Sequence, residues 1–133
     1  MRRVLGVLAF AAVATWGCHG DQGPIAGELS LRLATSRTGD RAILFRVIGL
    51  QHGVTAGTGT AYRVLSDTSA AGDTSWIAVI APQGSGIAAG ELARLAVADV
   101  RKAGDYQIAL TDIAAADYSV GSVSGVSLTV VRP

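Results

Sequence analysis

Most of the chain beyond residue 26 consists of short segments in which apolar side chains occupy every second position. In the first such segment, Leu29, Leu31 and Leu33 alternate with polar or small residues. A period of two places these leucines on one face of an extended strand, so the pattern predicts a half-buried β-strand. The same alternation recurs at residues 42–47, 61–65, 76–80, 106–111 and 126–131.

One segment, residues 91–100, fits two structures. Leu92, Leu95 and Val100 have helical spacing, and the Ala, Glu, Leu and Arg content favours a helix. Ala93, Leu95 and Val97 also alternate, which favours a strand. The strand is the preferred interpretation because of a family resemblance described below, and the helix remains the alternative.

Turn-rich stretches separate the patterned segments, among them residues 36–40, 51–59, 67–73 and 84–86. Seven or eight short strands joined in this way indicate an all-β fold. We therefore predict an antiparallel β-sandwich of jelly-roll-like type with about 7–9 strands. A closed barrel is the alternative. A chain of 133 residues has room for one such domain, and its 50% hydrophobic content is enough to fill a core.

The first residues have the pattern of an export signal. Arg2 and Arg3 precede an unbroken apolar run over residues 4–14. A helix of that length is too short to span about 30 Å of hydrocarbon, but it fits the apolar region of a secretory signal peptide. We expect a signal-peptide helix within residues 1–17.

Cys18 is the single cysteine, and it follows Gly17 where a bacterial lipobox would place it. Acylation of its thiol would anchor the mature chain to a membrane. The predicted organisation is a signal peptide (1–17), a tether (18–26) and a β-sandwich domain (27–133), exported and attached to the cell envelope. Two alternatives remain. One is an ordinary signal cut near residues 12–14, which gives a secreted or periplasmic protein, and the other is a structural N-terminal helix.

The charges exclude some classes of partner. From Cys18 onward there are nine Arg and Lys residues against ten Asp and Glu residues, a net charge of −1. Without a basic stripe, nucleic-acid binding is not expected. A single cysteine excludes both an internal disulfide and a cysteine-rich zinc site, and no cofactor is predicted.

The segment over residues 90–131 resembles the C-terminal half of cohesin-like domains. Gly90 precedes a Leu/Ala-rich strand, Ala103 and Gly104 form a turn, and Tyr106 begins a cleanly alternating strand. An Asp- and Ala-rich bend and a final Ser/Thr/Val strand follow. This resemblance implies a sandwich that binds a protein or a carbohydrate, as cohesins and similar carbohydrate-binding folds do. The cohesins' own dockerin partnership is not carried over, because the earlier strands show no match.

Residue types that carry catalysis are isolated from one another. His52 is alone in a loop, and Ser85 lies in Gly-Ser-Gly rather than in a nucleophile elbow. Two aspartate pairs flank turns and could bind calcium, but turn formation is the preferred explanation of both: Asp67 with Asp73, and Asp112 with Asp117. The sequence therefore predicts a non-enzymatic protein.

Aromatic side chains are the best candidates for ligand contact. Trp76, Tyr62 and Tyr106 could contact a ligand, for example by stacking on a sugar ring, but core packing is the preferred interpretation. Four arginines on the expected strands indicate a solvated sheet face, with a polar binding face as the alternative: Arg32, Arg46, Arg63 and Arg94. We expect a binding or assembly protein of the envelope. A purely structural lipoprotein is the main alternative, and a small hydrolase is a more distant one.

Overall fold

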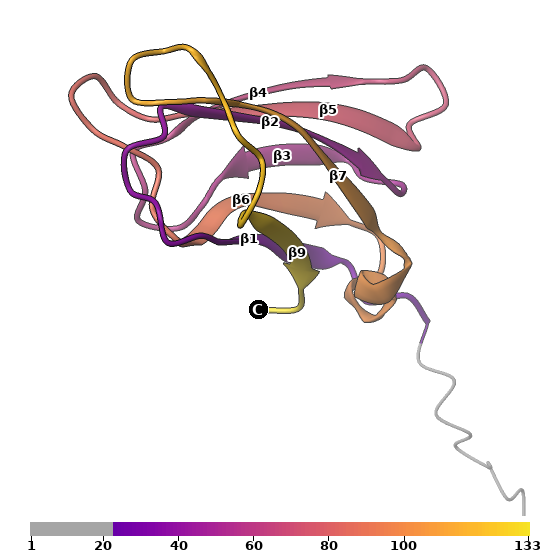
Figure 1. The fold of residues 1–133 in the computed structure, drawn as a ribbon. Coiled ribbons are helices and arrows are strands. Elements are labelled where there is room, and N and C mark those ends of the chain that lie inside the picture. The colour runs from indigo at the N-terminus through magenta and orange to yellow at the C-terminus, as the bar shows by residue number, and fades with distance from the viewer. Residues whose placement is uncertain (1–22) are drawn as a thin grey trace, which may run out of the picture.

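A computed structural model describes residues 23–133, which form nine strands and one short 3-10 helix, η1 (Figure 1). The strands are β1 (Gly27–Ala34), β2 (Ala42–Ile48), β3 (Gly53–Ala56), β4 (Arg63–Thr68), β5 (Thr74–Ile80), β6 (Gly90–Val97), β7 (Gln107–Ala114), β8 (Val120–Gly121) and β9 (Ser127–Val131), with η1 (Val100–Asp105) between β6 and β7. The predicted signal peptide and Cys18 lie outside the described residues.

The strands form two antiparallel sheets that pack face to face. Sheet A has the order β3-β6-β1-β9, and sheet B has the order β4-β5-β2-β7-β8. Figure 1 shows sheet B lying above sheet A. The prediction of an all-β antiparallel sandwich is confirmed.

The core is the layer of apolar side chains between the sheets. β1 contributes Leu29, Leu31 and Leu33, and β2 contributes Ile43, Phe45 and Val47, all buried. The remaining buried core residues are Ile77, Val79, Ile87, Leu92, Ala93, Leu95, Val97, Val100 and Ile113. Phe45 is the largest side chain that is fully buried. Because alternate residues on each strand face inward, the residues between them are directed to the two outer faces.

Most connections cross between the sheets. Within the described chain, only β4–β5 and β7–β8 join neighbouring strands of one sheet. β1 pairs with β6 in sheet A, while β2 pairs with β5 in sheet B. The central strands are therefore held by partners that lie far away in the sequence.

Each alternating segment named from the sequence overlaps a strand. Residues 91–100 are a strand over most of their length, as preferred, and then enter η1. The prediction of a simple loop over residues 51–59 is wrong, because β3 lies within it and pairs with β6. The two-residue strand β8 has no signal of its own in the sequence.

Two bulges interrupt the alternation. On β6, Leu31 pairs with Ala93 and Arg32 pairs with Glu91, so one extra residue, Leu92, is inserted. On β7, the partners of Phe45 and Leu44 are Leu110 and Asp112, with Thr111 as the extra residue. A bulge reverses which face the following side chains occupy. Glu91 and Arg94, three positions apart, consequently share one face.

The chain enters the sandwich beside η1. The carbonyl of Ile25 accepts a hydrogen bond from Val100 N–H (2.9 Å), and Asp99 caps η1 by accepting from Arg101 N–H (3.1 Å). The Arg101 guanidinium also donates to the Asp99 carboxylate and to the Gly23 carbonyl. The hydrogen bonds from Arg101 hold the pKa of Asp99 well below its usual range. The predicted tether therefore reaches the domain at its η1 end.

Replacing Phe45 by alanine tests the interior layer. We expect the Phe45→Ala substitution to lower the free energy of unfolding by about 3–5 kcal/mol, because it leaves a cavity between the sheets. Urea unfolding measures this loss. The control is Leu65→Ala on β4, where the side chain is 47% exposed and the expected change is within about 0.5 kcal/mol. Equal losses in the two variants would contradict the assigned inward and outward faces.

Candidate functional site

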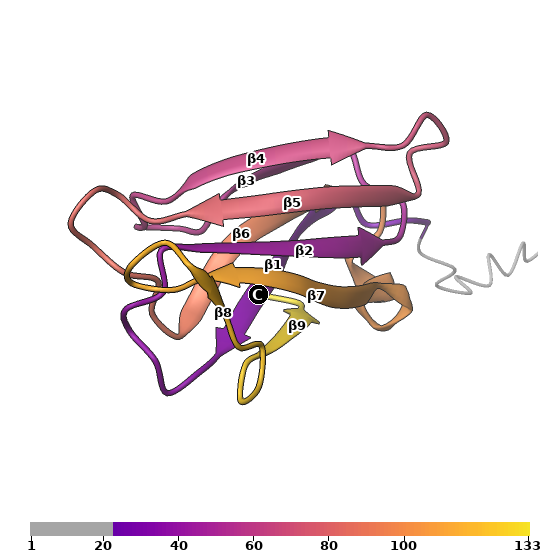
Figure 2. The ribbon, with the colours of Figure 1, turned by 45° about the horizontal axis from the view of Figure 1, so that its top comes forward.

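The outer surface of sheet B carries an apolar centre with charges around it. We call it the sheet B face, meaning the outward side chains of β4, β5, β2 and β7, the strands that Figure 2 shows side by side. Leu65, Trp76 and Ile48 on this face are 47%, 43% and 39% exposed. Leu44, Ala78 and Ile80 are half-buried among them. Contiguous exposed apolar groups on a sheet face mark a contact surface more often than scattered single ones do.

Strand register arranges this face in rows that cross the strands. In one row, Asp67 of β4 and Arg46 of β2 lie on either side of Trp76. In the next row, Leu65 and Leu44 lie on either side of Ala78, and that row ends at Asp112 of β7. Paired residues on neighbouring strands have Cβ atoms about 5 Å apart. The tryptophan is therefore close to a carboxylate on one side and to a guanidinium on the other.

The charged groups of the sheet B face form no ion pairs within residues 23–133. Within residues 23–133, no side-chain hydrogen bond or ion pair involves Asp67, Asp112 or Arg63. The Arg46 guanidinium carbon lies 5.6 Å from the centroid of the Trp76 ring, a cation–π distance. The Nε atom of Arg46 is buried without a hydrogen-bond partner in the described chain. The exposed charged groups of Asp67, Asp112 and Arg63 thus remain available to a partner.

The three aromatic residues chosen from the sequence occupy different environments. Trp76 lies on the sheet B face. Tyr62 is half-buried against the core, and its hydroxyl accepts a hydrogen bond from Ala88 N–H (3.2 Å). Tyr106 is also half-buried, and its hydroxyl donates to the Leu50 carbonyl. The structure therefore does not bring the two tyrosines to Trp76.

Tyr106 packs over a glycine and borders a small cavity. Gly49 has φ = 145°, and a Cβ at that position would overlap the Tyr106 ring. The cavity has a volume of about 230 Å³ and is lined by Gly49, Leu50, Lys102, Asp105 and Tyr106. Burial, and then the nearby charge of Asp105, raises the pKa of the Tyr106 hydroxyl. This tyrosine joins the β2–β3 turn to the end of η1.

The isolated polar candidates stay apart. His52 immediately precedes β3 and has an exposed side chain. Its backbone N–H donates to the Ala96 carbonyl (2.8 Å). Asp73 accepts a hydrogen bond from Ser69 Oγ (3.0 Å) within its own turn, and Asp117 accepts from Ser119 N–H (3.0 Å). The bonds from Ser119 lower the pKa of Asp117. Over residues 23–133 there is no group of three or more His, Cys, Asp or Glu side chains able to hold a metal ion.

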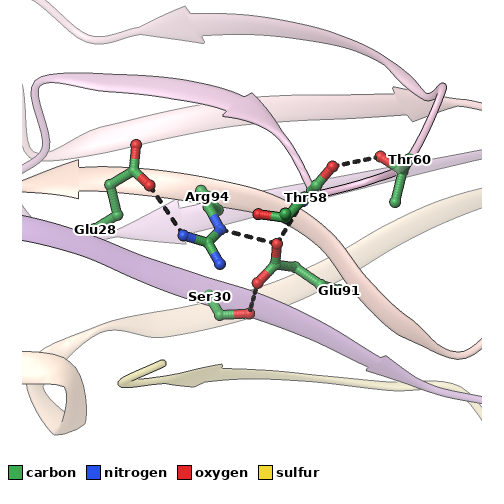
Figure 3. A network of polar contacts seen from close by, with 7 residues as sticks. Glu28, Ser30, Thr58, Thr60, Glu91 and Arg94 are labelled. Carbon is green, nitrogen blue, oxygen red and sulfur yellow. Dashed lines mark hydrogen bonds and ion pairs between the residues drawn. The ribbon is translucent and has the colours of Figure 1, made fainter.

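A polar network on the outer face of sheet A was not foreseen from the sequence (Figure 3). The carboxylate of Glu91 accepts hydrogen bonds from Ser30 Oγ (2.5 Å), Thr58 N–H (2.6 Å) and Arg94 Nε (2.9 Å). Arg94 also donates to Glu28 (3.2 Å). The network connects β1, β6 and the loop after β3. A strict period of two would place Glu91 and Arg94 on opposite faces of β6. The bulge places them on the same face, so the pair could not be predicted from the alternation.

The titration of Glu91 follows from these contacts. Burial raises its pKa, but the hydrogen bonds from Arg94, Ser30 and Thr58 outweigh burial and lower the pKa from 4.5 to about 2. The hydrogen bonds that Arg94 makes to Glu91 and Glu28 raise the pKa of Arg94. A carboxylate with all its partners in place is suited to fastening strands rather than to transferring protons.

Comparison with known proteins gave no relative from which a role could be transferred. No family model matches the chain, and neither curated proteins nor solved structures gave a match. In the part of the chain that the structure describes, no helix has the length and apolar character needed to cross a membrane. A function must therefore be argued from the surfaces of the sandwich.

Glu91 makes the stability of the sandwich depend on pH. Its pKa is lower in the folded chain than its ordinary value, so its contribution is complete above about pH 4.5 and is lost as the pH falls towards about 2. We expect Glu91→Gln to cost about 1–3 kcal/mol at neutral pH, because charged hydrogen bonds are removed. The difference from the parent chain should shrink through this pH window in urea titrations.

Glu28→Gln is the matched control for this experiment. It removes a more exposed partner of the same arginine, and exposed ion pairs contribute less than about 1 kcal/mol. A Glu91→Gln chain whose stability difference stays constant down to pH 2 would contradict the assigned network.

Proposed function

We propose that this chain is an exported, lipid-anchored, non-enzymatic binding protein of the bacterial cell envelope, and that the sheet B face is its contact surface. The observation that carries the proposal is Trp76, exposed at the centre of a face whose aliphatic groups are contiguous and whose charges are unpaired. Tryptophan and arginine are enriched among the residues that dominate binding energy in protein interfaces.

The distribution of polarity on this face favours a protein as partner. Leu65, Ala78 and Leu44 form an apolar centre, and Arg63, Asp112 and other charged groups border it. Protein interfaces have this organisation, with an apolar core inside a polar rim. A purely structural lipoprotein would instead be expected to have charged outer faces, without an exposed apolar patch, on both sheets.

Carbohydrate binding is the second candidate. It is favoured by one specific observation, the position of Trp76 between Asp67 and Arg46. An indole ring can stack on a sugar while neighbouring carboxylate and guanidinium groups bond to its hydroxyls. The resemblance to cohesin-like and carbohydrate-binding domains agrees with either candidate.

Attachment of the domain to the membrane rests on the lipobox-like position of Cys18. The described chain begins near η1, so an anchor before residue 23 would hold that end of the sandwich towards the membrane. The loops at the opposite end and both outer faces would then stay accessible to partners.

The anchor is tested by mass spectrometry of the protein purified from membranes. We expect a mature N-terminus at Cys18 that carries a diacylglyceryl group, and we expect Cys18→Ser to release the protein from the membrane fraction. Cleavage near residues 12–14 with a free thiol at Cys18 would refute the lipid anchor and leave a secreted protein.

The contact surface is tested by photo-crosslinking in whole cells. A benzophenone side chain at Leu65, on the sheet B face, should give defined crosslinked products, whereas the same group at the exposed Thr55 of β3 should give none. Trp76→Ala should reduce the yield at least tenfold, because interface tryptophans often contribute about 2 kcal/mol or more. Tyr118→Ala is the control, since Tyr118 is 68% exposed but lies in a loop.

Each outcome of this experiment points to one interpretation. Protein crosslinks that depend on Trp76 support the proposal. Trp76-dependent binding of purified envelope polysaccharide without protein crosslinks supports the carbohydrate candidate. Equal crosslinking from Leu65 and Thr55 would show that the sheet B face has no special role.

A further inference from the structure

We infer that the partner of the sheet B face is a second copy of this chain, bound face to face about a two-fold axis that runs along β5. This inference rests on the proposed function of that face and specifies its partner. It is carried by the order of residues across β4, β5 and β2, which makes the face complementary to itself.

The central row shows the complementarity. Asp67, Trp76 and Arg46 follow one another across the three strands. A two-fold axis along β5, lying between the two faces, exchanges the β4 side of one copy with the β2 side of the other. Asp67 of each copy then faces Arg46 of the other, and the two Trp76 side chains meet near the axis. An isologous interface requires this kind of match between a surface and itself.

The neighbouring rows obey the same rule. Leu65, Ala78 and Leu44 form the next row, so the axis places each Leu65 against a Leu44 and the two Ala78 residues against each other. One row further on, Ile80 lies near the axis, and Arg63 faces Ala42 at the rim. Like charges meet in none of the three rows, and the apolar side chains cover one another.

The charges on this face lack ion-pair partners within the described chain. Neither Asp67 nor Arg46 forms an ion pair with another residue of 23–133. By contrast, Glu91, Arg94 and Glu28 on the opposite sheet satisfy one another. Two reciprocal Asp67–Arg46 pairs would supply the missing partners on the sheet B face. Aligned packing of two twisted sheets, about 10 Å apart, is a favourable arrangement for such faces.

The size of the face predicts a weak dimer. With the axis along β5, only β4, β5 and β2 of the two copies overlap, and three strands about 4.8 Å wide and about six residues long give a platform on the order of 15 Å by 20 Å. Such a platform has an area of about 300 Å², which is well below the roughly 800 Å² of accessible surface that a standard specific interface buries on each partner. We therefore expect association in the micromolar range or weaker, strengthened where both copies are confined to one membrane.

A reciprocal charge exchange tests the inference in cells that express the full chain. Ala78→Cys places one thiol per copy near the axis, and a short bismaleimide should join two copies into a covalent dimer. Asp67→Arg should reduce the yield of this dimer about tenfold, because the introduced arginine of each copy would then face Arg46 of the other. Arg46→Asp should reduce it to a similar extent, because two carboxylates would then face each other. Co-expression of the two variants with different tags should restore a mixed dimer, since each reversed charge again faces its opposite.

Three controls accompany the exchange. Arg63→Asp makes the same change of charge on the same face but opposite Ala42, so it should leave the dimer unchanged. Thr55→Cys on sheet A should give no covalent dimer, and the chain without Ala78→Cys measures any reaction at Cys18. Leu65→Glu changes an exposed side chain and should also abolish the dimer, which keeps the test valid if Arg46→Asp fails to fold.

The results separate this inference from the proposed function. Single reversals that lose the dimer and a mixture that regains it support self-association. A folded Leu65→Glu chain that still dimerises, or folded reversal variants that do not recover on mixing, would overturn it. If Ala78→Cys gives no dimer while benzophenone at Leu65 captures a different protein, self-association is wrong and the contact surface stands. Absence of both products would remove both proposals.

Discussion

The packing of alternate side chains between the two sheets is the interaction on which the rest of this structure depends. Phe45, Leu31 and Leu95 are buried there without exposed surface. Once every second residue is committed to this layer, its neighbours on the same strand must face outward. The positions of Trp76, Arg46 and the other outer residues are therefore consequences of the interior, and they keep their places because moving them would shift the core out of register.

Two bulges modify this simple rule and explain why one segment was ambiguous. Leu92 and Ala93 are both buried, and the next buried residue is Leu95. The extra residue on β6 produces three-residue spacing inside a strand, which resembles the periodicity of a helix. It also places Glu91 and Arg94 on one face, where they form the network that joins β1, β6 and the loop after β3. The β6 bulge thus accounts both for the helix-like spacing in the sequence and for the polar contacts of Glu91 and Arg94.

The two outer faces differ in whether their charged side chains form ion pairs within the described chain. On sheet A, Glu91 is surrounded by donors and its pKa is about 2, so this face is fastened internally. On sheet B, Asp67 and Arg46 lie on either side of Trp76, and neither forms an ion pair within the described residues. β5 lies between β4 and β2, so Asp67 and Arg46 are two strands apart and do not form an ion pair with each other. Self-association would bring each of them to a partner while covering the leucines between.

The sequence by itself determined the fold class and the positions of the long strands, because period-two alternation is a local pattern. It also indicated Trp76 but grouped it with Tyr62 and Tyr106, whose hydroxyls bond to loop backbone instead. Only the tertiary structure decided that β3 forms, since its four residues become a strand by pairing with β6. Strand order and bulges also decided which side chains share a face. Those choices depend on contacts between residues far apart in the chain, and a local pattern contains no information about them.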